Sequence, residues 1–497
     1  MIIIRNAEVV IPGEGPSASR KADIIIDGDK IVSVGEPAPA GIDFEREIDA
    51  SGMLAIPGLI NGHFHSSANL LKGTVANMPL ELFMLYEVPP LMEGRNSTRS
   101  AYVRTMLGAA EMLKQGVTAV HDDAFYVPTP TGDEINAVME AYRDSGMRAT
   151  VSIDHPNVVE YAKYPYLEDI LPPELRHAMD KAPLMSEAEL LAIYGWFLKT
   201  WHRAEGGRLR VAMSCSAPQR VTVNYLQALS ELSRQHNIPH NIHLLETRQQ
   251  RVFGIEKLGK SLIEYVRDVG VLDRRTLAIH AIWIDDRDVE FLAESGCTVA
   301  HNPVCNLKIG SGIMPFRKLR NAGVPIALGT DEAIADDGIN FWTVLKVAGL
   351  IHNVTDPEYR QWPREDEILE AATMGGARGM VQEGEIGVLA AGAQADLVLL
   401  DKKTLALTPL NNVKRQLVYC ESGSSVRTVM VAGKVVVENG RLLSIDEKAL
   451  KAEAQELAAE AARYHEASSV GADRLEPYYR DMYLRSLRRD VGFSRWA

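Results

Sequence analysis

The sequence predicts an α/β protein, a (β/α)₈ barrel with a small β domain built from both chain ends. Two observations support this prediction. Short apolar runs alternate with longer segments of helical period across the middle of the chain, as a parallel barrel requires. Strand-like sequence broken by glycine-containing turns occurs at both ends, and two such ends can pair into one domain.

Eight apolar runs are the candidate barrel strands. Each run is short and apolar, and most carry polar residues near their C-terminal ends. The runs span residues 53–65, 117–124, 148–156, 209–217, 240–246, 277–283, 298–303 and 325–331.

Four segments between these runs have clear helical features. They span residues 98–116, 186–201, 223–236 and 286–296. Several begin with Ser, Thr or Asp and end near Gly, which is the usual pattern of helix caps. The rival architecture is a doubly wound open sheet. Because no G-x-G-x-x-G or Walker A run supports that sheet, the barrel is favoured.

The outer segments define the remaining domains. Asp27-Gly28 can form a tight turn between two strand-like runs near the start of the chain. Residues 384–401 and 426–443 are likewise strand-like runs interrupted by glycine-containing turns. We predict a β-sandwich from 1–57 and 381–443, a barrel over 58–380, and a helical extension over 444–497. The tail of this extension is rich in Arg and aromatic residues. It either packs on its own domain or forms a subunit contact, and we expect a homodimer or higher homo-oligomer.

Composition excludes several classes of partner. The chain of 497 residues has a formal net charge of −13, so its surface repels nucleic acid and anionic membranes. The sequence shows neither an apolar run of transmembrane length nor the features of a signal peptide. Its four cysteines form no C-x-x-C pair, which indicates free thiols. We expect a cytoplasmic protein that acts on a small-molecule substrate.

Polar residues occur near the C-terminal ends of five of the eight predicted strands. They are His63 and His65, His243 and Glu246, His280, His301, and Asp331. Each residue alone has a simple structural explanation, such as a hydrogen-bonded core histidine or a helix N-cap. Barrel enzymes build their active sites at this end of the strands, so five strands with such residues at one rim indicate a site.

These residue types suit a metal ion. Positions i and i+2 of a strand face the same side, so His63 and His65 can bind one ion together. His243 and Asp331 complete a set of three imidazoles and one carboxylate, which suits Zn²⁺ and also accommodates Fe²⁺ or Mn²⁺. Residues 209–217 contain no lysine that could be modified to bridge two ions. We therefore predict one divalent ion per subunit, with zinc as the first choice.

The same rim supplies candidates for catalysis. A bound divalent ion lowers the pKa of water and so provides a nucleophile. Glu246 follows His243 by three residues and is the candidate proton shuttle, or else a solvated carboxylate at a helix start. His280 could orient the nucleophile or polarise the group that is attacked. Asp331 could act as a base as well as a ligand.

Several runs taken together resemble the amidohydrolase superfamily. They are "PGLINGHFHSSANLLKG", "HLLET", "AIHAIW", "HNPVCNLKIGSG" and "ALGTDEA", with "GEIGVLAAGAQADLVLLD" later in the chain. The resemblance covers about residues 1–440 and is closest to the branch of cytosine, guanine and methylthioadenosine/S-adenosylhomocysteine deaminases and triazine hydrolases. It implies a distorted (β/α)₈ barrel with a small β-sandwich. It also implies metal ligands and catalytic residues, namely His63, His65, His243 and Asp331 as ligands, with Glu246 and His280 in catalysis.

The chain departs from this branch where we expect substrate to bind. After the last strand it reads "TDEAIADDGIN", which adds Glu332, and the fourth strand leads into "SCSAPQRVT", which offers Gln219 and Arg220. The segment "TVANMPLELFMLYEVPP" either gives the pocket an apolar wall or packs as an ordinary helix. The candidate substrate-binding residues are Phe83, Tyr86, Gln219, His301, Asn306 and Glu332.

The predicted reaction is cleavage of a C–N bond by a metal-activated water. Its most direct form is the hydrolytic deamination of an amino-substituted nitrogen heterocycle. The same residues could instead hydrolyse an amide, urea or carbamate, or dechlorinate a triazine. A non-catalytic scaffold is a further alternative, but it predicts missing ligands, and all four are present.

Overall fold

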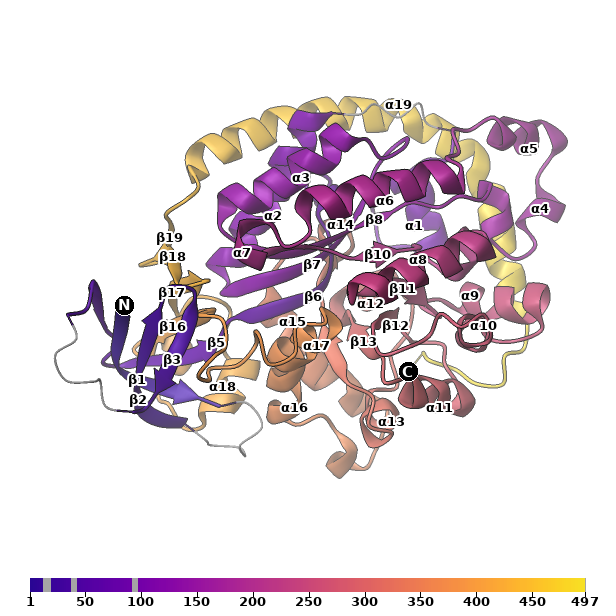
Figure 1. Cartoon of the computed structure of the whole chain (residues 1–497). Helices are drawn as coiled ribbons and strands as arrows, with labels where there is room; N and C mark the ends of the chain where they lie inside the picture. Colours follow the sequence, from indigo (N-terminus) through magenta and orange to yellow (C-terminus); the bar gives the residue numbers. More distant parts are fainter. Residues whose placement is uncertain (12–18, 37–42, 92–96, 497) are drawn as a thin grey trace.

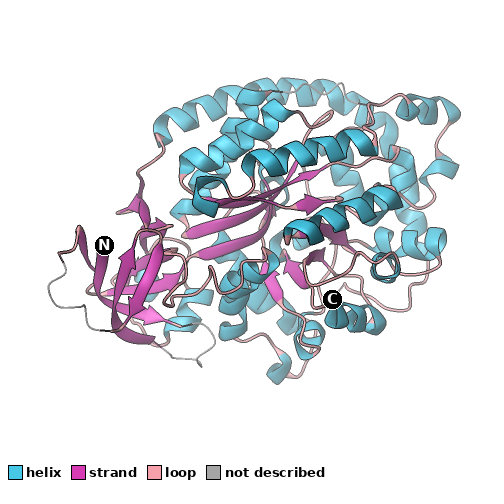
Figure 2. Ribbon diagram, viewed as in Figure 1, coloured by secondary structure: helices cyan, strands magenta, loops and turns pink. Residues whose placement is uncertain are grey.

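The structure is a computed structural model that describes residues 1–11, 19–36, 43–91 and 97–496. A strand-rich part that contains the N-terminus lies at the left of Figure 1. The rest of the chain forms an inner group of strands with helices around it, and Figure 2 shows the two kinds of element by colour.

The inner strands form a barrel-like arrangement of two parallel sheets. Their orders are β15-β6-β7-β8-β9 and β10-β11-β12-β13-β14. The first sheet contains β6 (Leu59–His65), β7 (Val117–Phe125), β8 (Arg148–Asp154), β9 (Leu209–Val211) and β15 (Asp331–Glu332). The second contains β10 (Met213–Ser214), β11 (His240–Leu244), β12 (Thr276–His280), β13 (Thr298–His301) and β14 (Ile326–Leu328). Because β9 leads into β10 and β14 into β15, the strands follow the circular order of a distorted barrel.

Three of the predicted strands are divided in the structure. The run 209–217 forms β9 and β10, and the run 325–331 forms β14 and β15, at the two places where the chain passes between the sheets. The run 53–65 forms β5 (Met53–Pro57) and β6. Gly58 lies at this last division, where a Cβ atom would stand 2.0 Å from the Thr118 hydroxyl, so only glycine fits.

Helices surround the inner strands (Figure 2). The four predicted helices are present as α2 (Thr98–Lys114), α6 (Glu187–Trp201), α8 (Val223–His236) and α11 (Asp286–Ser295). Ser186 and Asp285 form capping boxes at the starts of α6 and α11. The other α-helices before the C-terminal extension are α1 (Leu80–Glu87), α3 (Gly132–Ser145), α4 (Leu167–Ile170), α5 (Pro173–Asp180), α7 (Ala204–Gly207), α9 (Arg248–Phe253), α10 (Leu262–Asp268), α12 (Pro303–Lys308), α13 (Phe316–Asn321), α14 (Ala333–Asp336), α15 (Phe341–Leu350), α16 (Glu365–Glu370), α17 (Gly376–Gly379) and α18 (Val413–Tyr419).

Both chain ends join one nine-stranded sheet, which we call the end sheet. Its order is β19-β18-β17-β16-β5-β1-β2-β3, and β4 pairs with β1. Its remaining strands are β1 (Ile2–Val10), β2 (Ser19–Asp27), β3 (Lys30–Val34), β4 (Arg46–Asp49), β16 (Leu397–Asp401), β17 (Val426–Val431), β18 (Lys434–Glu438) and β19 (Arg441–Leu442). The antiparallel pairing of β16 with β5 joins the two chain ends, as the sequence predicts.

A buried ion pair ties the end sheet to the start of a barrel strand. Arg148, the first residue of β8, donates from Nε to Asp396 Oδ2 at 2.7 Å and from Nη2 to Oδ1 at 3.1 Å. Both side chains are 2% exposed. The backbone carbonyl of Asp396 accepts the amide hydrogen of Gly58 at 3.0 Å, so this contact lies at the junction between β5 and β6.

The C-terminal extension is one long helix, α19 (Glu447–Arg488), which arches over the barrel helices in Figure 1. It lies against α1 and α2, and the hydroxyl of Tyr86 donates to Asp473 on α19. The tail after α19 packs on the barrel of its own chain. Within the residues that the structure describes, no helix combines the length and the apolar character needed to cross a membrane.

Candidate metal centre and its cavity

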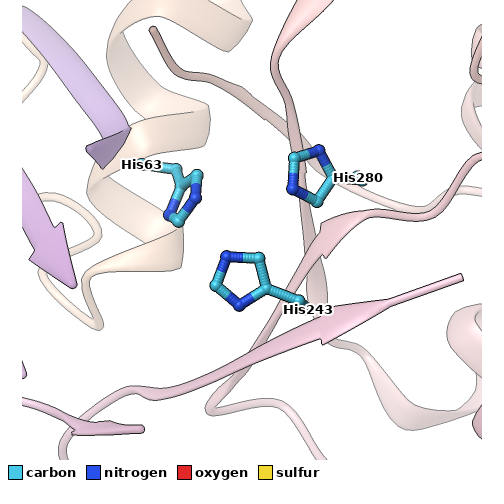
Figure 3. A group of neighbouring side chains, drawn as sticks. All are labelled: His63, His243 and His280. Atoms are coloured by element: carbon cyan, nitrogen blue, oxygen red, sulfur yellow. The ribbon is translucent and has the colours of Figure 1, made fainter. Parts of the chain in front are cut away.

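Four histidines meet at the C-terminal ends of the barrel strands. His63 and His65 lie on β6, His243 on β11 and His280 at the end of β12. The ring centroids of His63 lie 4.7 Å from His65 and 5.0 Å from His243, and those of His65 and His243 are 5.4 Å apart. Figure 3 shows the rings of His63, His243 and His280 around one shared space.

Asp331 on β15 completes the cluster. Its Oδ1 lies 3.6 Å from Nε2 of both His63 and His65, and its Oδ2 lies 3.6 Å from Nε2 of His280. Burial opposes the charge on Asp331, but the imidazoles of His63, His280 and His65 outweigh it and hold the pKa of Asp331 well below its ordinary value. This carboxyl group is therefore an anion that faces several imidazole nitrogens.

The hydrogen bonds of two imidazoles leave their Nε2 atoms directed at this space. His243 Nδ1 lies 2.8 Å from the carbonyl oxygen of Ser216, and His65 Nδ1 bonds to the carbonyl oxygen of Asp123. Since a carbonyl only accepts, each Nδ1 carries the hydrogen, and in the neutral form of the ring Nε2 keeps a lone pair. Histidine ligands of metal ions are oriented in this way.

His63 shows most directly that the cluster fits a metal ion. It is 1% exposed, and both of its ring nitrogens lack a hydrogen-bond partner among the described residues. Burial also lowers the pKa of His63, which favours the neutral ring that a metal needs. Four overlapping groups have ligand atoms within 4.8 Å of one another: His63, His243 and His280; His63, His65 and Asp331; Glu246, His280 and Asp331; and His65, Asp123 and Asp154.

Glu246 and His280 lie beside the cluster as a pair. Glu246 Oε1 is 3.5 Å from His280 Nε2. Burial raises the pKa of Glu246 well above its ordinary value, and the charges of Asp331 and Glu81 add to this shift. Burial lowers the pKa of His280 to about 3, so this ring is neutral, and its Nδ1 donates to Asn306 Oδ1 at 3.0 Å. A carboxyl group with a raised pKa can take up and release a proton near neutral pH.

A cavity of about 210 Å³ opens beside these groups. Its apolar wall comes mainly from α1 and the residues after β7, and it includes Leu80, Phe83, Met84, Val88, Phe125 and Val127. Its polar lining includes five carboxyl groups, namely Asp154, Glu160, Glu246, Asp331 and Glu332, and two cations, Lys163 and Arg220. The cavity therefore offers an apolar face and many hydrogen-bond acceptors to one small molecule.

The structure separates the predicted substrate-binding residues into two groups. Phe83 and Glu332 line the cavity, whereas the cavity walls among the described residues do not include Tyr86, Gln219, His301 or Asn306.

Each residue of the second group has another contact or position. Tyr86 turns toward α19 through Asp473. Gln219 lines a smaller adjoining pocket, and His301 Nε2 lies 3.1 Å from His352 Nε2. Asn306 reaches the site only through His280.

Two acidic residues beside the histidine cluster are not among the candidates from the sequence. Asp123 on β7 bonds to His65 through its carbonyl, and its carboxyl group accepts from Ser152 Oγ at 2.6 Å. Asp154 at the end of β8 lines the cavity. The signal was present in "HDDAF" and "SIDHP", where acids interrupt apolar strands, but these strands carried no metal-ligand pattern of their own.

Comparisons with known proteins identify the family of this chain. A family model described as the amidohydrolase family matches residues 54–436. A 5'-deoxyadenosine deaminase of Methanosarcina mazei is 30% identical over 92% of this chain and 98% of its own length. A 5-methylthioadenosine/S-adenosylhomocysteine deaminase of Pelotomaculum thermopropionicum is 32% identical, again over 92% of this chain and 98% of its own length.

Solved structures show the same fold. An adenosine deaminase from Xanthomonas campestris with bound zinc superposes with a TM-score of 0.81 at 25% identity, over 93% of this chain and 98% of that one. A zinc complex of atrazine chlorohydrolase from Arthrobacter aurescens superposes with a TM-score of 0.78 at 23% identity, over 92% and 100% of the two chains.

Proposed function

Because this chain belongs to the amidohydrolase family and is a metal-dependent hydrolase of carbon–nitrogen bonds, we propose that it deaminates an amino-substituted nitrogen heterocycle. The observation that carries the proposal is the combination of the His/Asp cluster with Glu246 and a cavity that has one apolar wall. A flat heterocycle suits the apolar wall, and the carboxylates suit amino or hydroxyl groups on the same molecule. The curated relatives named above point to an adenosine-like nucleoside as the first substrate to test.

We assign the metal-binding role to His63, His65, His243 and Asp331, with one zinc ion per subunit. Three imidazoles and one carboxylate are a donor set that zinc prefers, and the zinc in the adenosine deaminase structure supports the choice. When bound, the ion supplies a Lewis acid that activates water for attack on carbon.

The residues around the ion handle the protons of the reaction. Asp331 accepts the first proton of the attacking water, and Glu246 delivers a proton to the ring nitrogen next to the reacting carbon. The exocyclic amine then takes the proton held by Asp331 and leaves as ammonia. The hydroxyl group gained from water gives its proton back to Glu246, so the carbon keeps the oxygen as a carbonyl and both carboxyl groups return to their starting states. His280 is neutral, lies 3.5 Å from Glu246 and orients the oxygen during attack.

A screen for ammonia release tests the proposal. The purified protein with zinc is incubated with amino-substituted purine nucleosides, pyrimidines and triazines, and each is paired with the same ring without its amino group. We expect ammonia from an adenosine-like compound and none from its unsubstituted partner. If no amino heterocycle releases ammonia while an amide, urea, carbamate or chlorotriazine is hydrolysed, deamination is refuted.

We also propose three features of the whole protein. The end sheet folds over its own apolar cluster as a small β-sandwich domain formed by 1–57 and 381–443, beside a barrel over 58–380 and an extension over 444–497. The protein works as a homo-oligomer. The four cysteines are free, which supports a reducing compartment such as the cytoplasm. Limited proteolysis, sedimentation and cell fractionation test these three features.

A further inference from the structure

The last described residues, Phe493–Trp496, lie against the barrel, far along the chain from the strands that they touch. The C mark in Figure 1 lies near α11. We call these four residues the C-terminal clasp. Two loops receive its hydrogen bonds, residues 281–284 after β12 and residues 310–313 after α12.

The first loop directly follows His280. Arg495 donates from Nε to the carbonyl oxygen of Ile282 at 3.0 Å, and its Nη2 bonds to the carbonyl oxygen of Ile284. The ring of Trp496 packs against Trp283 with a centroid distance of 4.8 Å. His280 has a φ of 73°, in the left-handed region that favours glycine, and such a backbone persists only where its surroundings hold it.

The second loop is linked to His280 by hydrogen bonds through Asn306. Trp496 Nε1 donates to the carbonyl oxygen of Gly310 at 3.0 Å, and the amide of Ile313 donates to the carbonyl oxygen of Arg495 at 2.8 Å. Within this segment, the amide of Ser311 donates to the carbonyl oxygen of Asn306 at 2.9 Å. Asn306 is the residue whose side chain accepts from His280 Nδ1 at 3.0 Å.

The clasp also reaches the strand end that carries Glu246. The amides of Ile282 and Trp283 donate to the carbonyl oxygen of Leu245, the residue before Glu246, at 3.1 and 2.8 Å. Arg248, two residues after Glu246, lies over the rings of both Trp283 and Trp496 at 5.4 and 5.9 Å. The C-terminal clasp therefore contacts both the loop that follows His280 and the segment that follows Glu246.

We propose that the C-terminal clasp is a positioning element for catalysis, because Arg495 and Trp496 hold the backbone that aims His280 and Glu246 at the substrate. Arg495 is hydrogen-bonded to two carbonyl groups of the loop after β12, and Trp496 is hydrogen-bonded to one carbonyl group of the loop after α12. Neither residue lines the cavity, so neither contacts substrate. A displacement of about 1 Å in a catalytic group can cost on the order of 100-fold in rate.

The test is the variant Arg495→Ala in the full-length zinc-loaded protein. We expect kcat to fall about 10- to 100-fold while KM stays within about threefold and zinc content is unchanged. We also expect faster amide hydrogen exchange in residues 281–284 and 310–313. Arg495→Lys keeps the charge but reaches only one carbonyl at a time, so an intermediate kcat is expected.

Arg485→Ala is the matched control, because Arg485 lies on α19 and, among the described residues, its ion pair is with its exposed neighbour Asp481 at 2.9 Å. Unchanged exchange and unchanged kcat in Arg495→Ala overturn the proposal, as does a loss of activity that only follows a loss of zinc. If Arg495→Ala does not fold, Trp496→Ala takes its place with the same expected results. The kinetic part rests on the proposed function, whereas the exchange part does not. A wild type without deaminase activity refutes the function and leaves the clasp to be judged by exchange.

Discussion

The two ends of the barrel strands use polar residues in opposite ways. On β8, Asp154 at the C-terminal end lines the cavity, whereas Arg148 at the start is buried and bonded to Asp396 of the end sheet. On β11, His243 at the site keeps an Nε2 atom for a ligand, whereas His240 at the start has a buried ring whose two nitrogens lack a hydrogen-bond partner among the described residues. The polar groups at the rim line the cavity, whereas Arg148 and His240 do not. Those at the opposite end affect only folding, and variants at the two ends should therefore separate activity from stability.

The largest expected effect is at the rim, in His63→Ala. Removing one of the four proposed ligands should lower zinc affinity by more than about 100-fold and abolish turnover. Zinc content by elemental analysis and ammonia release are the measurements, with His236→Ala on the exposed end of α8 as the control. A variant that keeps a full complement of zinc would remove His63 from the ligand set.

Glu246→Gln should separate metal binding from proton transfer. The amide keeps the size of the side chain but cannot carry a proton, so kcat should fall about 10²- to 10⁴-fold while zinc remains bound. Glu231→Gln, at an exposed position of α8, is the control. A kcat near that of the wild type would show that another group moves the proton.

The sequence predicts the position of a site residue when its neighbours in the chain determine that position. His63 and His65 were predictable because the two-residue period of a strand places both on one face. The division between the end sheet and the barrel falls at Gly58, between β5 and β6, inside the run 53–65 that the sequence predicts as one strand. Eight strand positions with helices between them likewise predicted the barrel-like order.

The remaining parts of the site depend on contacts between residues far apart in the sequence. Asp123 holds His65 from another strand, and Asn306 reaches His280 from α12. Tyr86 was expected in the pocket, but its hydroxyl bonds to Asp473, which lies 387 positions later on α19. No local sequence pattern predicts contacts between residues so far apart in the chain. The contact of Tyr86 with α19 and the C-terminal clasp could therefore be found only in the structure.

At the opposite end, Arg148→Met should destabilise the protein without affecting the chemistry. The change leaves the Asp396 carboxylate buried without its cation, and breaking such a pair costs about 3–5 kcal/mol in the free energy of unfolding. Denaturant unfolding measures the loss, while kcat and zinc content should match the wild type. The double variant Arg148→Met/Asp396→Leu removes the stranded charge and should recover part of the stability. If it is no more stable than the single variant, the ion pair is not the cause.

The smallest effect is expected at His240, through pH. Burial, assisted by the charge of Arg275, lowers the pKa of His240 to about 3, against about 6.5 in an unfolded chain. Between these two values the unfolded chain binds the proton and the folded chain does not, so stability falls as the pH decreases. From pH 7 to pH 5 this histidine alone should remove roughly 2 kcal/mol of unfolding free energy. His240→Gln should reduce the pH dependence by that amount, and His236→Gln, at an exposed site, is the matched control. Contributions from every other histidine cancel in the difference between variant and wild type. Identical pH dependence in His240→Gln and the wild type would mean that His240 is protonated equally in the two states, and that the start of β11 is open to water.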